Sequence, residues 1–91
     1  MEDIKNGRVL VDFYATWCGP CKMMAKQLEK YEDEVDAVKV VKVNVDENHE
    51  LAQEFSVRSI PTIVYMEDGE IVDRTVGAKN LEQLKEFTKV S

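Results

Sequence analysis

The sequence predicts an α/β fold: a mixed four-stranded sheet with the element order β-α-β-α-β-β-α, sandwiched between helices. Strand-like runs at 8–14 and 37–45 flank a long amphipathic segment, which is typical of a β-α-β unit. Two further strand-like runs surround Asp68-Gly69, a strong signal for a β-hairpin. Because 91 residues leave room for one hydrophobic core, we expect residues 1–91 to form a single domain.

The first half of the chain contains two predicted strands and one long helix. The segment "RVLVDFY" (8–14) is rich in β-branched and aromatic residues and has the length of a strand. From Gly19 to about Val35, apolar residues recur every three or four positions between charged ones, which predicts an amphipathic helix. The segment "AVKVVKVNV" (37–45) returns to strand composition. Since a helix connects the two strands, they should be parallel with a right-handed crossover.

The second half predicts a hairpin between two helices. Asn48 is placed to cap a short helix that is apolar on one side. The segment "TIVYMEDGEIVDRTV" (62–76) predicts two antiparallel strands joined by a tight turn. Asn80 and Gln83 have the spacing of a capping box at the start of a last helix.

Composition and charge exclude several classes of protein. With 44% hydrophobic and 33% charged residues, the chain has the composition of a soluble globular domain. No apolar run is long enough to span a membrane. The start "MEDIKNGRVLV" lacks a cationic segment followed by a long apolar one, so we expect no secretory signal and a cytoplasmic location. The net charge of −6, without a basic cluster, argues against a nucleic-acid surface.

The two cysteines, Cys18 and Cys21, could form a staple, a metal site or a redox pair. A staple closing so short a loop would contribute only about 2 kcal/mol, and the cytosol would tend to reduce it. Structural zinc usually needs four Cys or His ligands, and the only further candidate is His49, which is expected to be a solvated surface residue. A metal shared between the cysteines of two chains remains an alternative.

A redox role for the cysteines fits the local physics better. Residues three apart at the start of a helix lie on one face, close enough for a disulfide. Free backbone N–H groups and the positive end of the helix dipole favour a thiolate at Cys18. Pro20 suits the first helical turn because its missing N–H is not needed there, and Gly19 leaves the sulfur accessible. Cys18 should therefore attack, and Cys21 should resolve the mixed disulfide.

Asp12 is unusual because it lies within a strand that should be buried. A buried carboxyl group without partners is costly, and desolvation should raise its pKa enough to keep it protonated near neutrality. We therefore expect Asp12 to exchange a proton with the nearby sulfur of Cys21, at a cost in stability.

The segment "WCGPCK", which follows a strand and opens a helix, resembles the active site of the thioredoxin family, a family well known for a CxxC thiol of low pKa. The segments "VLVDFYATWCGPCKMMA", "VKVNVDEN", "SVRSIPTIVYMEDGE" and "VGAKNLEQLKEF" are similar to that family in order and spacing. The resemblance covers roughly residues 8 to 89 and implies the thioredoxin fold.

The resemblance also implies roles for individual residues. Cys18 corresponds to the attacking cysteine and Cys21 to the buried resolving one, Asp12 to the buried aspartate beneath it, and Lys42 to the lysine near that aspartate. The implied substrate-binding residues are Trp17, Gly19, Pro20, Ile60, Pro61 and Gly77.

Several of these residues have simpler interpretations. Trp17 could be a packed aromatic residue, and Pro61 could follow an ordinary trans bond, although the context "SIPT" matches the family's cis-proline loop. Gly77 could be a turn glycine, and Lys42 could extend its ammonium group into water.

The resemblance implies a protein-disulfide reductase whose Cys18–Cys21 pair cycles between dithiol and disulfide as a thiol–disulfide electron carrier. It needs no metal and no organic cofactor. Its expected partners are disulfide-containing client proteins and a thioredoxin reductase, and we expect a monomer. A glutathione-dependent, glutaredoxin-like reductase would carry Pro-Tyr between the cysteines, and an oxidase or isomerase would carry a histidine there. A non-catalytic binding subunit, or an iron–sulfur or metal site shared by two chains, remains an alternative from another class.

The chain departs from the family pattern at three points. Only "MEDIKNG" stands where thioredoxins usually carry another strand and helix, so we expect a trimmed fold that lacks both. Lys26 occupies the position where many members have a helix-kinking proline, so the helix should be straighter. Tyr14 stands where many members have a second tryptophan.

Overall fold

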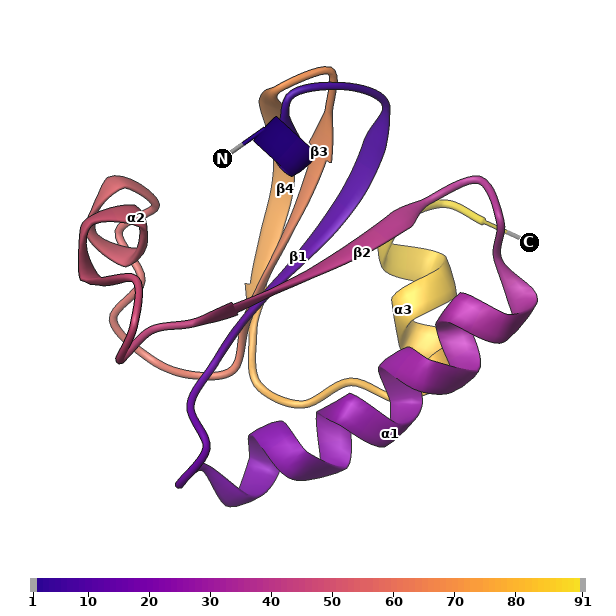
Figure 1. Cartoon of the computed structure of the whole chain (residues 1–91). Coiled ribbons are helices and arrows are strands. Elements are labelled where there is room, and N and C mark those ends of the chain that lie inside the picture. The colour runs from indigo at the N-terminus through magenta and orange to yellow at the C-terminus, as the bar shows by residue number, and fades with distance from the viewer. Residues whose placement is uncertain (1, 91) are drawn as a thin grey trace.

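The structure of this protein is a computed structural model that describes residues 2–90 (Figure 1). The elements are η1 (Glu2–Ile4), β1 (Arg8–Tyr14), α1 (Gly19–Glu34), β2 (Lys39–Asn44), α2 (His49–Glu54), β3 (Thr62–Glu67), β4 (Glu70–Val76) and α3 (Leu81–Phe87). The predicted order of strands and helices is confirmed. The short 3-10 helix η1 was not predicted.

The four strands form one mixed sheet in the order β2-β1-β3-β4. β1 and β2 are parallel, whereas β3 is antiparallel to both β1 and β4. The hairpin turns at Asp68 and Gly69, whose φ angles of 51° and 86° lie in the left-handed region that such tight turns require. In the order β2-β1-β3-β4, the strand β1, which carries Asp12, is an inner strand with a neighbour on each side.

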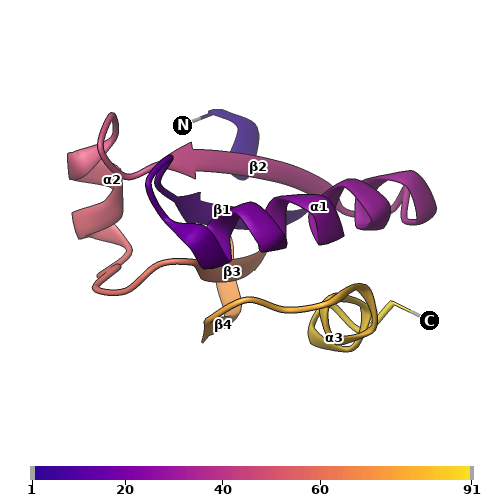
Figure 2. The ribbon, with the colours of Figure 1, turned by 90° about the horizontal axis from the view of Figure 1, so that it is seen from below.

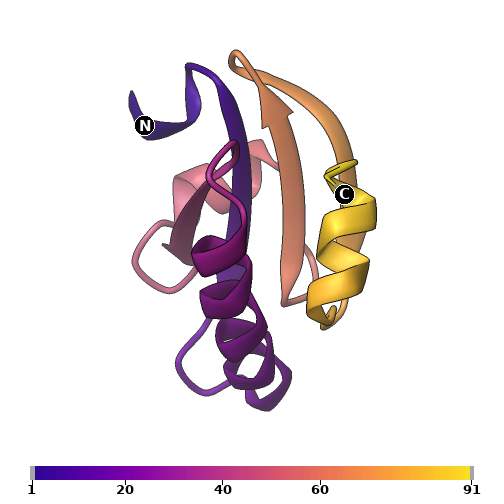
Figure 3. The same ribbon diagram turned by 90° about the vertical axis from the view of Figure 1, so that its right-hand side faces the viewer.

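Helices cover both faces of the sheet, as predicted. Figure 2 shows α2 beyond the start of α1 and α3 beside the later turns of that helix. Figure 3 shows α1 and α3 in front of the strands, with α2 behind them. Val9, Val11 and Phe13 of β1 pack in the cluster that contains Phe55 and Ile4, on the side of α2 and η1. Because side chains alternate along a strand, Asp12 points to the other face, that of α1.

The layer between the sheet and α1 fixes the position of the helix that carries the cysteines. Met24, Leu28 and Tyr31 recur on one side of α1 and are fully buried against Leu10 and Ile63 of the sheet. Each such side chain contributes about 1.5–3 kcal/mol through burial. The first turn of α1 is thereby held at the end of the sheet.

The helix ends confirm one predicted cap and correct another. At α3, the Asn80 side chain accepts a hydrogen bond from Gln83 N, and the Gln83 side chain accepts one from Asn80 N, which is the predicted capping box. Asn48 is the N-cap residue of α2 but makes no side-chain cap bond. Its amide instead donates to the carbonyl of Asn44, because the chain turns back toward the end of β2 there.

The last turn of α1 carries acidic side chains, whose negative charge is unfavourable at the C-terminal end of a helix dipole, but a lysine of α3 neutralises one of them. Lys85 of α3 forms a 2.7 Å ion pair with Glu34 in the last turn of α1. Within residues 2–90, each helix is too short or too polar to cross a lipid bilayer.

Candidate functional site

The two cysteines are joined by a disulfide at the start of α1. Cys18 is the N-cap residue and Cys21 lies in the first turn, with 5.2 Å between their Cα atoms. The Cys21 backbone N–H donates to Cys18 Sγ at 3.2 Å, so the sulfur occupies the place of a capping oxygen. In the reduced protein, the same N–H and the helix dipole would stabilise negative charge on Cys18.

Gly19 and Pro20 form the exposed corner of the active-site turn. Pro20 lies in the first turn, where α1 has no use for its missing N–H. A Cβ atom added at Gly19 would meet no other atom within 4 Å, so the turn is open to solvent at this position. Cys18 and Cys21 themselves are only 5% and 3% exposed. Among residues 2–90, no three His, Cys, Asp or Glu side chains come together as a potential metal site, and His49 is exposed on α2.

Asp12 lies in the sheet, on the face that α1 covers, and is 1% exposed. Its Oδ1 atom is buried without a hydrogen-bond partner among residues 2–90. Burial raises the pKa of Asp12 from 3.8 to about 6, and the positive charge of Lys42 opposes part of that rise. Lys42 is the register partner of Asp12 on the neighbouring parallel strand, and its side chain is exposed.

The direction of the Asp12 pKa shift is as expected from the sequence, and the pKa of about 6 lies close to neutrality. Both the protonated form and the carboxylate are therefore accessible to Asp12 near neutral pH, and the carboxylate can accept a proton.

The loop before β3 lies beside the cysteines. The Ile60-Pro61 peptide bond is cis, as predicted. Ile60 packs against the cluster that contains Cys18 and Cys21, and Pro61 is buried. The hydroxyl of Thr62 donates a 2.5 Å hydrogen bond to the carbonyl of Ser59, which closes the loop around the proline. The segment "SIPT" (59–62), which suggested the cis-proline loop, is also the sequence signal for the contact between Thr62 and Ser59.

Gly77 connects the end of β4 to this loop. Its N–H donates a 2.9 Å hydrogen bond to the carbonyl of Pro61. Its φ angle of 99° lies in a region that residues with a Cβ rarely adopt. The turn therefore has a conformational reason for a glycine, and it lies directly beside the cis-proline.

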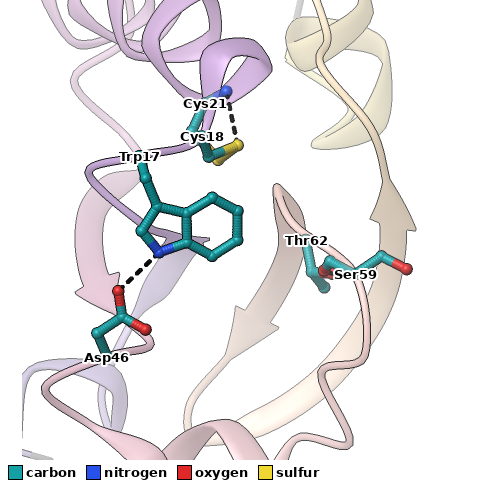
Figure 4. The surroundings of a disulfide bond; sticks show 6 residues. All are labelled: Trp17, Cys18, Cys21, Asp46, Ser59 and Thr62. Carbon is teal, nitrogen blue, oxygen red and sulfur yellow. Dashed lines mark hydrogen bonds between the residues drawn. A yellow bond between two sulfur atoms is a disulfide. The ribbon is translucent and has the colours of Figure 1, made fainter.

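Trp17 is on the surface rather than packed inside, with 70% of the residue exposed. Its indole Nε1–H donates a 2.9 Å hydrogen bond to Asp46 Oδ2, as Figure 4 shows below the disulfide. Trp17 and Ile60 also line one shallow cavity of about 200 Å³. The sequence analysis assigned no role to Asp46, although it lies in the segment "VKVNVDEN" that carries the resemblance.

The structure thus brings most of the predicted residues together. Ile60 packs against the cluster that contains Cys18 and Cys21, and one hydrogen bond links Gly77 to Pro61. An apolar surface lies next to the disulfide, and the buried Asp12 carboxylate lies on the sheet face that α1 covers. Such a site can support exchange between this disulfide and thiols of another molecule.

Comparison with known proteins agrees with this arrangement. The family model described as Thioredoxin matches residues 1–90. The thioredoxin of Bacillus subtilis (strain 168) is 49% identical over 86 residues, which is 93% of this chain and 83% of the relative. The thioredoxin of Chlamydia caviae is 48% identical over 81 residues, covering 89% of this chain and 79% of the relative.

Solved structures show the same fold. The crystal structure of Fasciola hepatica thioredoxin superimposes with a TM-score of 0.87 and 41% identity, over 97% of this chain and 84% of that one. The oxidised form of mitochondrial thioredoxin 3 from Saccharomyces cerevisiae gives a TM-score of 0.88 and 42% identity, over 97% and 83%. Before β1, the described residues form only the short 3-10 helix η1, so a strand and an α-helix are absent from this part, as expected.

Proposed function

This chain belongs to the thioredoxin family and is a thiol–disulfide oxidoreductase that acts as a protein-disulfide reductase, and we propose that Cys18 is its attacking sulfur and Cys21 its resolving one. The supporting observation is the N-cap geometry. Cys18 Sγ accepts the Cys21 N–H at 3.2 Å and lies at the positive end of α1, so its thiolate is the better stabilised of the two.

In the first step, the thiolate of Cys18 attacks one sulfur of a client disulfide. A bond forms between Cys18 and that sulfur, and the client's own S–S bond breaks. The second client sulfur leaves as a thiolate and takes a proton from water. Trp17, Pro20, Ile60 and Gly77 form the surface against which the client lies, with the buried Pro61 beneath it and the exposed Gly19 at its corner.

In the second step, Cys21 attacks the sulfur of Cys18 and releases the client. The Asp12 carboxylate takes the proton of the Cys21 thiol, which creates the attacking thiolate. The client leaves with both sulfurs reduced, and two electrons pass from the cysteine pair to the client. Lys42 tunes this transfer, since its charge lowers the pKa of Asp12.

The resulting Cys18–Cys21 disulfide must be reduced again before another cycle. The family implies a reductase as electron donor, and we propose a thioredoxin reductase acting on a cytoplasmic monomer. Since the cysteine pair itself carries the electrons, we expect the protein to need no metal or organic cofactor.

Replacing each cysteine with serine separates the two roles. Reduced Cys21→Ser should accumulate a covalent complex with a disulfide-containing client, visible on a non-reducing gel, because nothing resolves it. Cys18→Ser should form none. The reverse pattern, or complexes with both variants, would overturn the assignment.

The reduction potential separates a reductase from an isomerase. We expect a value near the established thioredoxin potential of about −270 mV, which lies about 90 mV, or about 4 kcal/mol, below that of a disulfide isomerase. A value in the isomerase range would contradict a reducing role. If Cys18→Ser lost reductase activity but kept the cellular role, the chain would be a binding subunit instead.

A further inference from the structure

A second groove lies beside the proposed client surface, between α1 and the segment that leads into α3. It encloses about 360 Å³. The residues that line it are Met23, Lys26, Gln27, Ala78, Lys79 and Asn80. Two of the six are lysines and none is acidic. Met23 is 68% exposed, so the groove combines a flexible apolar contact with positive charge.

The ammonium group of Lys79 is held in place by the backbone. Nζ donates hydrogen bonds to the carbonyls of Val76 at 3.0 Å and Gly77 at 3.3 Å. An ammonium group has three donors, so one remains for a ligand. Within residues 2–90, neither Lys79 nor Lys26 forms an ion pair with a carboxylate. The groove therefore presents an oriented cation and a second one on the neighbouring helix, and neither has an ion-pair partner among the described residues.

Hydrogen bonds connect this groove to the redox site. Gly77, whose carbonyl binds Lys79, donates its N–H to Pro61 of the cis-proline loop. The backbone N–H of Lys79 in turn donates to Met24 Sδ at 3.2 Å, one turn beyond Cys21. A client that lies against Gly77 would therefore also be close to Lys79 and Lys26, because the groove continues the proposed client surface.

The other flank of the disulfide is mainly acidic. Asp46 binds Trp17, and the cavity beside α2 is lined by Glu47, Glu50 and Glu54. Among the described residues, Arg58 is the one cation that lines the neighbouring cavity of Trp17 and Ile60. Figure 2 shows α2 to the left of the start of α1, whereas the segment that leads from β4 into α3 passes below that start. An anionic client side chain would be repelled on the α2 flank and attracted on the Lys79 flank, which gives the client a preferred direction.

We propose that the groove between α1 and the Ala78–Asn80 segment is a specificity subsite for an acidic side chain next to the client's reacting disulfide. Lys79 and Lys26 bind the carboxylate, and Met23 and Ala78 contact its apolar neighbour. This subsite deepens the proposed function and rests on it.

The test uses three synthetic peptides, each closed by one disulfide and differing only in a Glu, Gln or Lys next to the attacked cysteine. Their rates of reduction by an excess of pre-reduced protein are measured without a reductase. Because each exposed ion pair has a modest strength, we expect the Glu peptide to react about three- to tenfold faster than the Lys peptide at low salt. The preference should decrease at about 0.5 M salt, where screening is strong.

Lys26→Gln/Lys79→Gln should remove most of this preference, and Lys79→Arg should keep it. Since the chain carries a net charge of −6, any loss of two lysines also changes its long-range field. Lys30→Gln/Lys89→Gln is the matched control, because both residues are exposed and lie outside the groove. An equal loss in the control, or an unchanged preference in the groove variant, would overturn the subsite.

A binding measurement separates the subsite from the reductase function. Peptides with serines in place of both cysteines are titrated into the ¹⁵N-labelled protein. The Glu peptide should shift the amides of Ala78 and Lys79 more than the Lys peptide does, and equal shifts would overturn the subsite. If the Gln peptide were not reduced at all while these shifts differed, the proposed function would be wrong and the subsite right.

Discussion

The guanidinium group of Arg8 donates a 2.7 Å hydrogen bond from Nη2 to the backbone carbonyl of Thr88, 80 positions later in the chain. Its Nε also donates to the hydroxyl of Tyr65 at 2.5 Å, and that hydroxyl donates to Glu67. The hydroxyl of Tyr31 and that of Thr88 share a buried 2.7 Å hydrogen bond. Arg8 thus ties the end of α3 to the sheet.

Replacing Arg8 with leucine should lower the free energy of unfolding by about 1–3 kcal/mol. The change removes two hydrogen bonds and leaves the Thr88 carbonyl without the donor it has in the native protein. Urea denaturation of the oxidised protein measures the effect. Arg58→Leu is the control, because Arg58 is exposed and should change stability by less than about 0.5 kcal/mol. Equal losses for the two variants would contradict this anchoring role.

Asp12→Asn should make the protein more stable at neutral pH. Since the folded-state pKa of Asp12 is raised from 3.8 to about 6, the unfolded chain releases this proton at lower pH than the folded one. Stability should therefore fall between about pH 4 and pH 6 and stay low above that, by about 3 kcal/mol in all. The difference in stability between the asparagine variant and the native protein should grow over the same range.

Thermal unfolding of both proteins at pH 4 and pH 7.5 measures this difference, and Asp33→Asn, on the exposed side of α1, should show no such trend. The rate of client reduction should fall in Asp12→Asn, because the proton acceptor is lost. A variant that melts lower than the native protein and reduces clients at the native rate would contradict both the cost and the role of Asp12.

Asn80→Ala should destabilise α3 by about 1 kcal/mol. The Gln83 N–H loses its acceptor, whereas the reciprocal bond from the backbone N–H of residue 80 to the Gln83 side chain can remain. Asn80→Ser should keep most of the stability, since serine is an equally good cap. Urea denaturation of the three proteins decides the matter, and identical losses for alanine and serine would show that the cap contributes little.

Asp46→Ala should free the indole ring of Trp17 without unfolding the protein. The hydrogen bond between them is exposed, so stability should change by less than about 1 kcal/mol. Because Trp17 is the only tryptophan in the sequence, steady-state fluorescence anisotropy reports on this ring alone. Anisotropy should fall in Asp46→Ala and stay unchanged in Glu47→Ala. No difference between the two variants would mean that Asp46 does not hold the ring.

The helices and strands were predicted well because each depends mainly on residues that are close together in the sequence. The hairpin follows from the conformation that Asp68-Gly69 adopts, and α1 follows from the spacing of Met24, Leu28 and Tyr31. Residue patterns alone also singled out Cys18, Cys21 and Asp12. The cis bond at Pro61 required the family resemblance, since residue type alone favours trans.

What could not be predicted depends on how the backbone folds back on itself, both near in the sequence and far along it. Arg8 meets Tyr65 and Thr88 only after the sheet and α3 have assembled. Asn48 looked like a capping residue, but the nearby Asn44 carbonyl offered its side chain another partner. A turn at Gly77 was considered, but the sequence did not indicate that the Lys79 ammonium group would bind the carbonyl of Gly77.

The inner position of β1 determines how the active site responds to thermal fluctuation. β1 has a hydrogen-bonded strand on each side, whereas β4 is an edge strand that is exposed along most of its length. Amide hydrogens around Asp12 should therefore exchange with solvent only when the whole molecule opens, while those near the end of β4 can exchange through local opening. The backbone around Asp12 thus keeps its conformation for as long as the molecule stays folded. The turn after β4, which faces the client, can change conformation many times during the same period.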